Sequence, residues 1–116
     1  MSDSFSVSVE RQGDDLGVVT LSGEVDIFTA PRFKECLIEM LDSGVRRLVV
    51  DLAAVTFIDS TGIGVLIGGV RRVNGAGGSM AIVVSTRPVE RVLGVTGLDR
   101  VFSMYPTRAE ALDALD

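Results

Sequence analysis

The side chains best suited to chemistry form one short run, Asp59-Ser60-Thr61, which follows an apolar segment and precedes a glycine-rich one. A hydroxyl becomes a nucleophile when a neighbouring base removes its proton, and histidine is the commonest such base. The chain contains no histidine, which excludes the Ser-His-Asp and Cys-His arrangements and removes the main transition-metal ligand. We therefore expect that this chain is not an enzyme.

The glycines after this run raise the question of a nucleotide cofactor. Gly62-Ile63-Gly64 would open a helix after a strand, as a dinucleotide-binding fingerprint does. The third glycine of that fingerprint should stand at Ile67 but stands one residue later, at Gly68, and residues 80–84 lack the acidic residue expected about twenty positions on. The G-x-x-x-x-G-K-[ST] loop for nucleoside triphosphates is absent as well. We expect no cofactor, and we interpret the hydroxyls as a substrate for another protein.

The charge balance narrows the partners. A net charge of −5 argues against nucleic acid, because binding to phosphate backbones needs clustered Lys and Arg. The pairs Arg46-Arg47 and Arg71-Arg72 are better explained as solvated ends of elements than as a phosphate site. No apolar run approaches the ~20 residues of a membrane span, and the first residues lack the basic region of a signal peptide. We expect no contact with nucleic acid or membrane.

Two further groups have ordinary explanations. Cys36 is the single cysteine and lies in an expected helix, which favours a small buried hydrophobe over a reactive thiol. A lone cysteine without an export signal fits a reducing cytoplasm. Asp14-Asp15 could touch a hard cation, but adjacent carboxylates in a turn are more often solvated. We expect a cytoplasmic protein without a metal.

Hydrophobic periodicity indicates the elements that must position Asp59-Ser60-Thr61. Residues 4–10 and 18–21 are typical of strands, and the turn residues 12–15 between them favour a hairpin. Three later strands are expected at residues 48–52, 80–84 and 101–104. Four helices are expected at residues 29–44, 60–74, 88–97 and from 107 onward. Their starts carry the N-cap Thr29 with Pro31 in the first turn, the N-cap Asp59, Pro88, and a capping box from Thr107 to Glu110.

The resulting order is β-β-α-β-α-β-α-β-α, and at 116 residues the chain has room for one hydrophobic core. We expect a single domain over residues 1–116. Helices between strands imply mostly parallel pairing, while the leading hairpin adds an antiparallel part. The predicted fold class is α/β, a mixed sheet packed by four helices. The strand at 48–52 is expected in the middle of the sheet, and Phe57 and Ile58 are expected to anchor the junction in the core.

The helix after Asp59 has an unusual outer side. At 100° per residue an apolar stripe faces the sheet, made of Ile63, Leu66, Ile67, Val70 and Val73. The other side holds Thr61, Gly64, Val65, Gly68 and Arg72. Each helical glycine costs about 0.8–1 kcal/mol relative to Ala, and close packing on the sheet can explain Gly62 and Gly69 but not Gly64 and Gly68. We interpret the bare side as a docking surface; the cap alone would be an ordinary helix start.

Three motifs resemble those of one family. Asp59-Ser60-Thr61-Gly62-Ile63-Gly64 resembles the D-S-[ST]-G-[LI]-G signature of the STAS domains, specifically the bacterial anti-sigma-factor antagonists. Gly23-Glu24-Val25-Asp26 followed by Thr29-Ala30-Pro31 resembles the family's G-E-[ILV]-D…[ST]-A-P element, and Val95-Thr96-Gly97-Leu98 resembles its hydrophobic-[ST]-G-L turn. The matches stand in the family's order, at consistent spacing, over almost the whole chain.

The resemblance implies a partner-switching cycle in transcriptional control, of the kind used in stress response or sporulation. The unphosphorylated domain would bind an anti-sigma factor and so free a sigma factor. The anti-sigma factor is commonly also a GHKL-type serine kinase, which would phosphorylate Ser60, and a PP2C-type phosphatase would remove the phosphate. Asp26 would lie close to Ser60. The docking residues would be Asp26, Asp59, Thr61, Gly62, Gly64, Val65, Gly68 and Arg72. Family members are often small monomers, and self-association stays open.

Two alternatives remain. A STAS domain can scaffold a signalling complex or sense a ligand without being phosphorylated, which the serine at position 60 beside Asp59 disfavours. A small-molecule or nucleotide-binding enzyme is disfavoured by the missing histidine and phosphate loop, and by an aromatic content of 5% that is low for a ligand cage.

Overall fold

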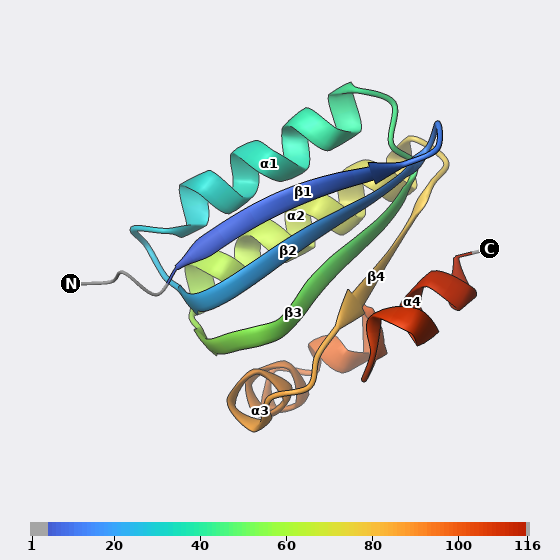
Figure 1. Cartoon of the computed structure of the whole chain (residues 1–116). Coiled ribbons are helices and arrows are strands. Elements are labelled where there is room, and N and C mark those ends of the chain that lie inside the picture. The colour runs from blue at the N-terminus through green and yellow to red at the C-terminus, as the bar shows by residue number, and fades with distance from the viewer. Residues whose placement is uncertain (1–4, 116) are drawn as a thin grey trace.

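The computed structural model describes residues 5–115 (Figure 1). Residue 4, where the first expected strand begins, lies outside this part. The elements follow the expected order, with one additional 3₁₀ helix, η1. They are β1 (Ser6–Gln12), β2 (Leu16–Val25), α1 (Ala30–Asp42), β3 (Arg47–Ile58), α2 (Ser60–Gly75), β4 (Ser79–Val83), α3 (Arg87–Val95), η1 (Leu98–Arg100), β5 (Ser103–Tyr105) and α4 (Arg108–Ala114).

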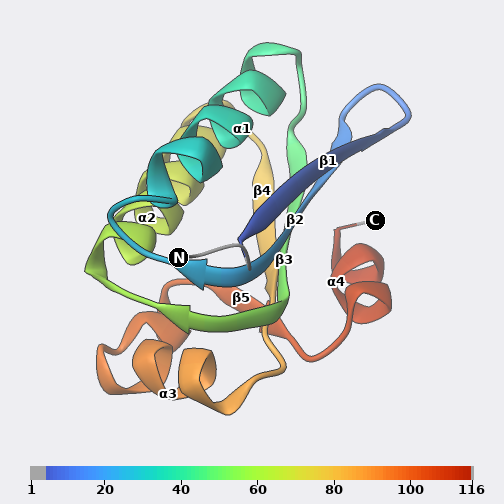
Figure 2. The same cartoon turned by 60° about the vertical axis from the view of Figure 1, so that its left-hand side comes forward.

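The five strands form one sheet in the order β1-β2-β3-β4-β5. β1 is antiparallel to β2, and the three other neighbouring pairs are parallel. The mixed sheet with a leading hairpin is therefore confirmed. Because β2 and β3 run in the same direction, their carboxyl ends lie at the same edge of the sheet. The loops that lead into α1 and α2 consequently lie side by side (Figure 2).

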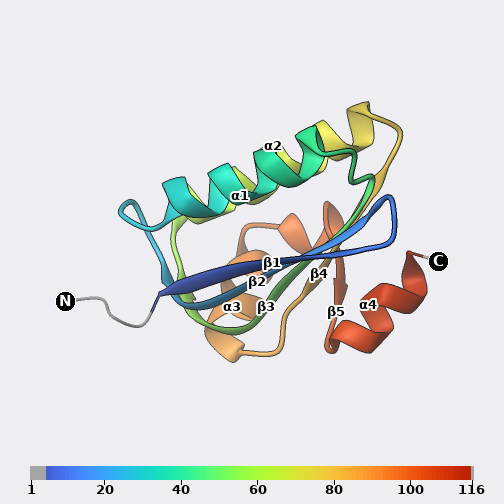
Figure 3. The same cartoon turned by 45° about the horizontal axis from the view of Figure 1, so that its top comes forward.

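Helices α1 and α2 lie next to each other on one face of the sheet, and α4 covers part of the other face (Figure 3). The main core joins α1, α2 and α3 to the sheet, and a smaller cluster lies between the sheet and Ala111 of α4. Within α2 the expected stripe faces the core, with Ile63, Leu66 and Val73 buried and Ile67 and Val70 half-buried. Within residues 5–115, no helix has the length and apolar character needed to cross a membrane.

Strand β3 is longer than the expected 48–52. Its first half pairs with β2 and β4, and its second half pairs with β2 alone. The Thr86 hydroxyl donates a hydrogen bond to the carbonyl of Val55 (2.7 Å), which gives the unpaired edge a partner. Strand side chains alternate between faces, so Ile58 is buried while Phe57 is 47% exposed. The prediction that both residues anchor the junction in the core was wrong for Phe57.

Two other boundaries differ from expectation. β2 extends over Leu16–Val25 because β3 pairs with it along nearly its whole length. The last strand is Ser103–Tyr105, not residues 101–104, since the chain is still turning at Phe102, whose N–H donates to the carbonyl of Leu98 (3.0 Å). Phe102 is nevertheless buried in the core. The apolar residues at 101–102 therefore led to a wrong strand start, although Phe102 is buried as an apolar residue is expected to be.

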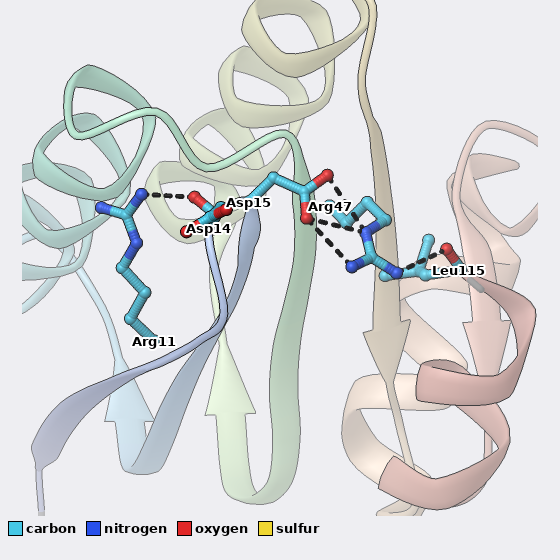
Figure 4. Close-up of polar contacts among 5 residues, drawn as sticks. All are labelled: Arg11, Asp14, Asp15, Arg47 and Leu115. Carbon is cyan, nitrogen blue, oxygen red and sulfur yellow. Dashed lines mark hydrogen bonds and ion pairs between the residues drawn. The ribbon is translucent and has the colours of Figure 1, made fainter.

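The amino end of β3 is held by a network around Arg47 (Figure 4). The Arg47 guanidinium pairs with Asp15 in the β1–β2 turn (2.9 Å) and donates to the carbonyl of Leu115 after α4 (3.3 Å). The hydrogen bond from Arg47 is the main reason that the pKa of Asp15 is lowered. The interpretation of Arg46-Arg47 and Asp14-Asp15 as merely solvated was therefore wrong for Arg47 and Asp15. It was also wrong for Arg46, whose guanidinium donates to the carbonyl of Leu41 (3.0 Å). A second pair, Arg108 with the buried Asp51 (2.9 Å), ties α4 to the sheet.

Candidate functional site

Asp59 is the N-cap of α2, as predicted. Its Oδ1 accepts hydrogen bonds from the backbone N–H of Thr61 (2.9 Å) and of Gly62 (3.3 Å), so two of the free N–H groups at the helix start are satisfied. The Thr61 hydroxyl also donates to the same oxygen. That hydroxyl bond, assisted by the two N–H groups, lowers the pKa of Asp59. Asp59 is thus a carboxylate at neutral pH.

Ser60 and Thr61 differ in what their hydroxyls do. Thr61 is engaged with Asp59. Ser60 is the first residue of α2 and is exposed, and its hydroxyl has no hydrogen-bond partner among residues 5–115. A hydroxyl that is exposed and unpaired can receive a group without first breaking a contact within the fold.

The β2–α1 loop is held beside this helix start. The N–H of Asp59 donates to the carbonyl of Val25 (3.1 Å), which joins the two carboxyl-terminal strand ends and brings Asp26 to the same edge. Asp26 Oδ1 accepts from the N–H of Phe28 (2.9 Å) and of Thr29 (3.1 Å). Thr29 does occupy the N-cap position of α1, but its hydroxyl donates to the carbonyl of Glu24 (2.9 Å) and makes no cap bond. The predicted N-cap position of Thr29, with Pro31 in the first turn, is therefore confirmed, although the Thr29 side chain does not cap the helix.

This loop exposes two large apolar side chains that our sequence reasoning missed. Phe28 is 86% exposed and Ile27 is 63% exposed, although the hydrogen bonds to Asp26 order the backbone that carries Phe28. Exposed apolar side chains that cluster mark interaction sites more reliably than scattered ones do. Their position between two predicted elements, outside any periodic pattern, was the signal that could have revealed them.

The glycines of α2 divide as the sequence predicted. A Cβ at Gly62 would come within 2.7 Å of the side chains of Val25 and Ile58, and one at Gly69 within 3.1 Å of Leu37. At Gly64 and Gly68 it would meet nothing within 4 Å. Gly62 was predicted among the docking residues, but it is buried and faces the core.

A groove of about 420 Å³ lies between α1 and α2 along this open side. Its lining includes Thr61, Gly64, Val65, Gly68 and Arg72, the five residues predicted for the outer side of the helix. Helix α1 contributes Lys34 and Ile38, which the sequence did not indicate, and Leu37 and Gly69 complete the lining. Thr61 and Arg72 are eleven residues apart on α2, or about 16 Å at 1.5 Å per residue. The groove therefore begins next to Ser60 and extends along three helical turns.

Three other features that the sequence singled out are possible metal ligands, the thiol of Cys36 and the turn at Gly97. Among residues 5–115, no three Cys, Asp or Glu side chains converge where a metal ion could be held. Cys36 is half-buried against the core, and burial raises the pKa of its thiol, as expected for a packing residue and not a nucleophile. Gly97, in the third sequence motif, has a φ of 75° and precedes η1. A glycine suits that left-handed turn.

The fold and the capped, glycine-lined helix define a class of protein. Residues 6–111 match the STAS domain family, and the chain belongs to this family. An anti-sigma factor antagonist from Mycobacterium paratuberculosis has a crystal structure that superposes with a TM-score of 0.89 at 33% identity, over 97% of this chain and 95% of that one.

Two sequence relatives have the same kind of name. The anti-sigma-B factor antagonist of Staphylococcus epidermidis is 33% identical over 73% of this chain and 79% of its own length. The anti-sigma F factor antagonist of Paenibacillus polymyxa is 32% identical over 85% of this chain and 86% of its own.

Proposed function

We propose that this chain is an anti-sigma-factor antagonist whose binding is switched off by phosphorylation of Ser60. The unphosphorylated form binds an anti-sigma factor and so releases a sigma factor. That anti-sigma factor is a GHKL-type serine kinase, and a PP2C-type phosphatase restores the free hydroxyl. The names of the relatives support the assignment as an anti-sigma-factor antagonist. The observation that supports phosphorylation at Ser60 is its exposed, unpaired hydroxyl, which lies at the start of a helix whose outer side is lined by glycine.

The docking surface is centred on the Asp59–Ser60 junction. It extends on one side into the groove between α1 and α2 and on the other side to Phe28 and Ile27 of the β2–α1 loop. The apolar loop residues can be desolvated at low cost, while the carboxylates of Asp26 and Asp59 are already engaged by backbone N–H groups. Such an ordered, partly apolar surface can bind without a large loss of conformational entropy.

A phosphate on Ser60 would act on the complex more than on the fold. It adds about −1.5 to −2 charges beside Asp59, whose lowered pKa keeps it ionised. A helix start usually stabilises an anion by roughly 0.3–1 kcal/mol, but Asp59 already accepts from the N–H groups of Thr61 and Gly62. Burying this doubly charged group against a partner without matching cations costs several kcal/mol, and about 1.4 kcal/mol already changes affinity tenfold.

The test pairs the purified chain with each GHKL-type anti-sigma-factor kinase encoded in the genome that encodes this chain. With ATP, we expect phosphate on the wild type and none on Ser60→Ala, which keeps its affinity for the kinase. Ser60→Asp should bind at least about a hundredfold more weakly, or about 2.7 kcal/mol. Addition of the PP2C-type phosphatases of the same genome should restore binding of the phosphorylated chain.

Three results would contradict parts of this proposal. Undiminished labelling of Ser60→Ala would place the acceptor elsewhere, with Thr61 the next candidate. Tight binding by Ser60→Asp would remove the charge argument. Binding of a kinase without any phosphate transfer would favour the alternative, an unphosphorylated STAS scaffold or ligand-sensing domain.

A further inference from the structure

The groove between α1 and α2 differs in charge from the rest of the chain. The whole chain carries a net charge of −5, yet the groove lining contains two cations, Lys34 and Arg72, and no acidic residue. Glu35 and Glu39 also belong to α1 but do not line the groove. Within residues 5–115, neither the Lys34 nor the Arg72 side chain has an ion-pair or hydrogen-bond partner, and both residues are exposed. A partner with carboxylates would find two uncompensated positive charges here.

The walls of the groove determine which backbone conformation fits it. Both walls are formed by the interiors of helices, where N–H and C=O groups are bonded within the helix. An extended peptide would therefore find no main-chain partners, and its own backbone polar groups would be desolvated unpaired. A helix satisfies its backbone internally and presents only side chains. The bare positions Gly64 and Gly68 let such a helix approach closely.

We propose that the groove holds an amphipathic helix of the anti-sigma factor, about three turns long, with an apolar stripe and flanking carboxylates. The inference rests on the proposed function and names the partner element that this site receives. The apolar stripe packs on Gly64, Val65 and Gly68, as in other helix-in-groove complexes. The carboxylates face Lys34 from α1 and Arg72 from the last turns of α2.

An acidic occupant also connects the groove to the switch. Thr61 lines the groove and directly follows Ser60, so a phosphate on Ser60 lies at the mouth of the groove. The phosphate repels carboxylates at the Ser60 end of the groove, whereas a carboxylate that faces Arg72, about 16 Å along the helix from Thr61, is largely screened from it. Charge at Ser60 can thus weaken contacts beyond those it touches, because electrostatic forces extend over roughly 8–10 Å at physiological salt.

The experiment uses the kinase that binds the wild-type chain in the assay above and compares two neighbouring arginines. Both arginines are exposed, but Arg72 lines the groove and Arg71 does not. Arg72→Glu and Lys34→Glu should each weaken binding by about tenfold or more, and Arg71→Glu should change it by less than about threefold. Raising the salt from about 0.05 to 0.5 M should weaken the wild type more than the Lys34→Glu/Arg72→Glu double variant. Circular dichroism confirms that each variant is folded.

A charge exchange identifies the occupant. Replacing acidic residues by lysine, one candidate helix of the kinase at a time, should restore binding to Arg72→Glu when the correct helix is changed. Equal losses for Arg71→Glu and Arg72→Glu, or no rescue from any helix, would overturn the groove proposal. The proposed function would still stand if Ser60→Asp releases the kinase in the same assay. A wild-type chain that binds none of the kinases overturns the proposed function, and the occupant of the groove with it.

Discussion

Helix α2 carries glycines on both of its long sides, and an added side chain would meet opposite conditions on the two. On the inner side, a Cβ at Gly62 would press on Val25 and Ile58, and one at Gly69 on Leu37. On the outer side, a Cβ at Gly64 or Gly68 would meet open space. The inner glycines make room for the chain's own core. The outer glycines leave room that no residue of the described chain fills.

The two pairs of glycines therefore need different explanations, one in the packing of the fold and one in the proposed binding of a partner. Each glycine costs helix stability by about 0.8–1 kcal/mol relative to Ala. The inner pair offsets that cost by allowing α2 to pack closely on the sheet. The outer pair has no such compensation in the described part of the fold, which is why we propose that this surface binds a partner.

The largest expected effect comes from placing the same side chain on each side. Gly62→Leu should destabilise the fold by about 3 kcal/mol, because overpacking of a well-filled core typically costs 1–3 kcal/mol and the Cβ alone already collides. Gly64→Leu should stabilise it by about 0.8 kcal/mol through helix propensity. Urea unfolding of both variants measures the difference. Changes of the same sign would show that the two sides are not distinct.

The same Gly64→Leu variant should lose partner binding even though it folds more stably. A leucine side chain would occupy the groove where we place the partner helix, and we expect affinity for the kinase to fall by at least about thirtyfold, or roughly 2 kcal/mol. Biolayer interferometry checks this value. Gly75→Leu is the matched control, since Gly75 ends α2 outside the groove and also has open space around it. Retained binding by Gly64→Leu would place the docking surface elsewhere.

A smaller effect on stability is expected at the start of α2, where Asp59 is the N-cap of the helix. Asp59→Ala removes the acceptor of the Thr61 and Gly62 N–H bonds and should cost about 1 kcal/mol, whereas Asp59→Asn retains capping ability and should cost less. Thermal or urea denaturation distinguishes the two. Equal stability of the wild type and Asp59→Ala would mean that α2 is held by packing alone.

The smallest effect is a pH dependence of that cap. The pKa of Asp59 is lowered in the folded chain from its ordinary value of 3.8, so folding favours the carboxylate. Its contribution to stability is fully present above this ordinary value and is lost as the pH falls through the folded pKa. The difference in unfolding free energy between the wild type and Asp59→Ala should therefore be constant above about pH 5 and shrink below pH 3.8. If the difference in unfolding free energy instead grows as the pH falls, the carboxylate form of Asp59 does not stabilise the fold.

Much of the site could be predicted because it depends on short-range relations. The cap at Asp59 joins groups no more than three residues apart. The two sides of α2 follow from its 100° periodicity, and the division between Gly62 and Gly64 emerged from that pattern. Even so, Gly62 was assigned to the docking surface on the strength of a motif, although the periodicity had already suggested that it packs inward.

Other features escaped prediction because distant segments create them. The ladder with β2 extends β3 to Ile58, and the alternation within that extension turns Phe57 outward. The Thr29 hydroxyl bonds to the carbonyl of Glu24 and does not cap α1, and Phe28 in the same loop is exposed. In each case, the local pattern was compatible with more than one arrangement.

The amino-acid sequence thus sufficed for the order of elements, the capped start of α2 and its glycine-lined side, since each reflects hydrogen bonds or periodicity within a few residues. The groove needed the folded chain. Lys34 and Ile38 come to face Gly64 and Gly68 because α1 and α2 bury their apolar sides on the same face of the sheet. Which helices become neighbours depends on how the whole domain buries its apolar surface, so it cannot be predicted from any one local segment.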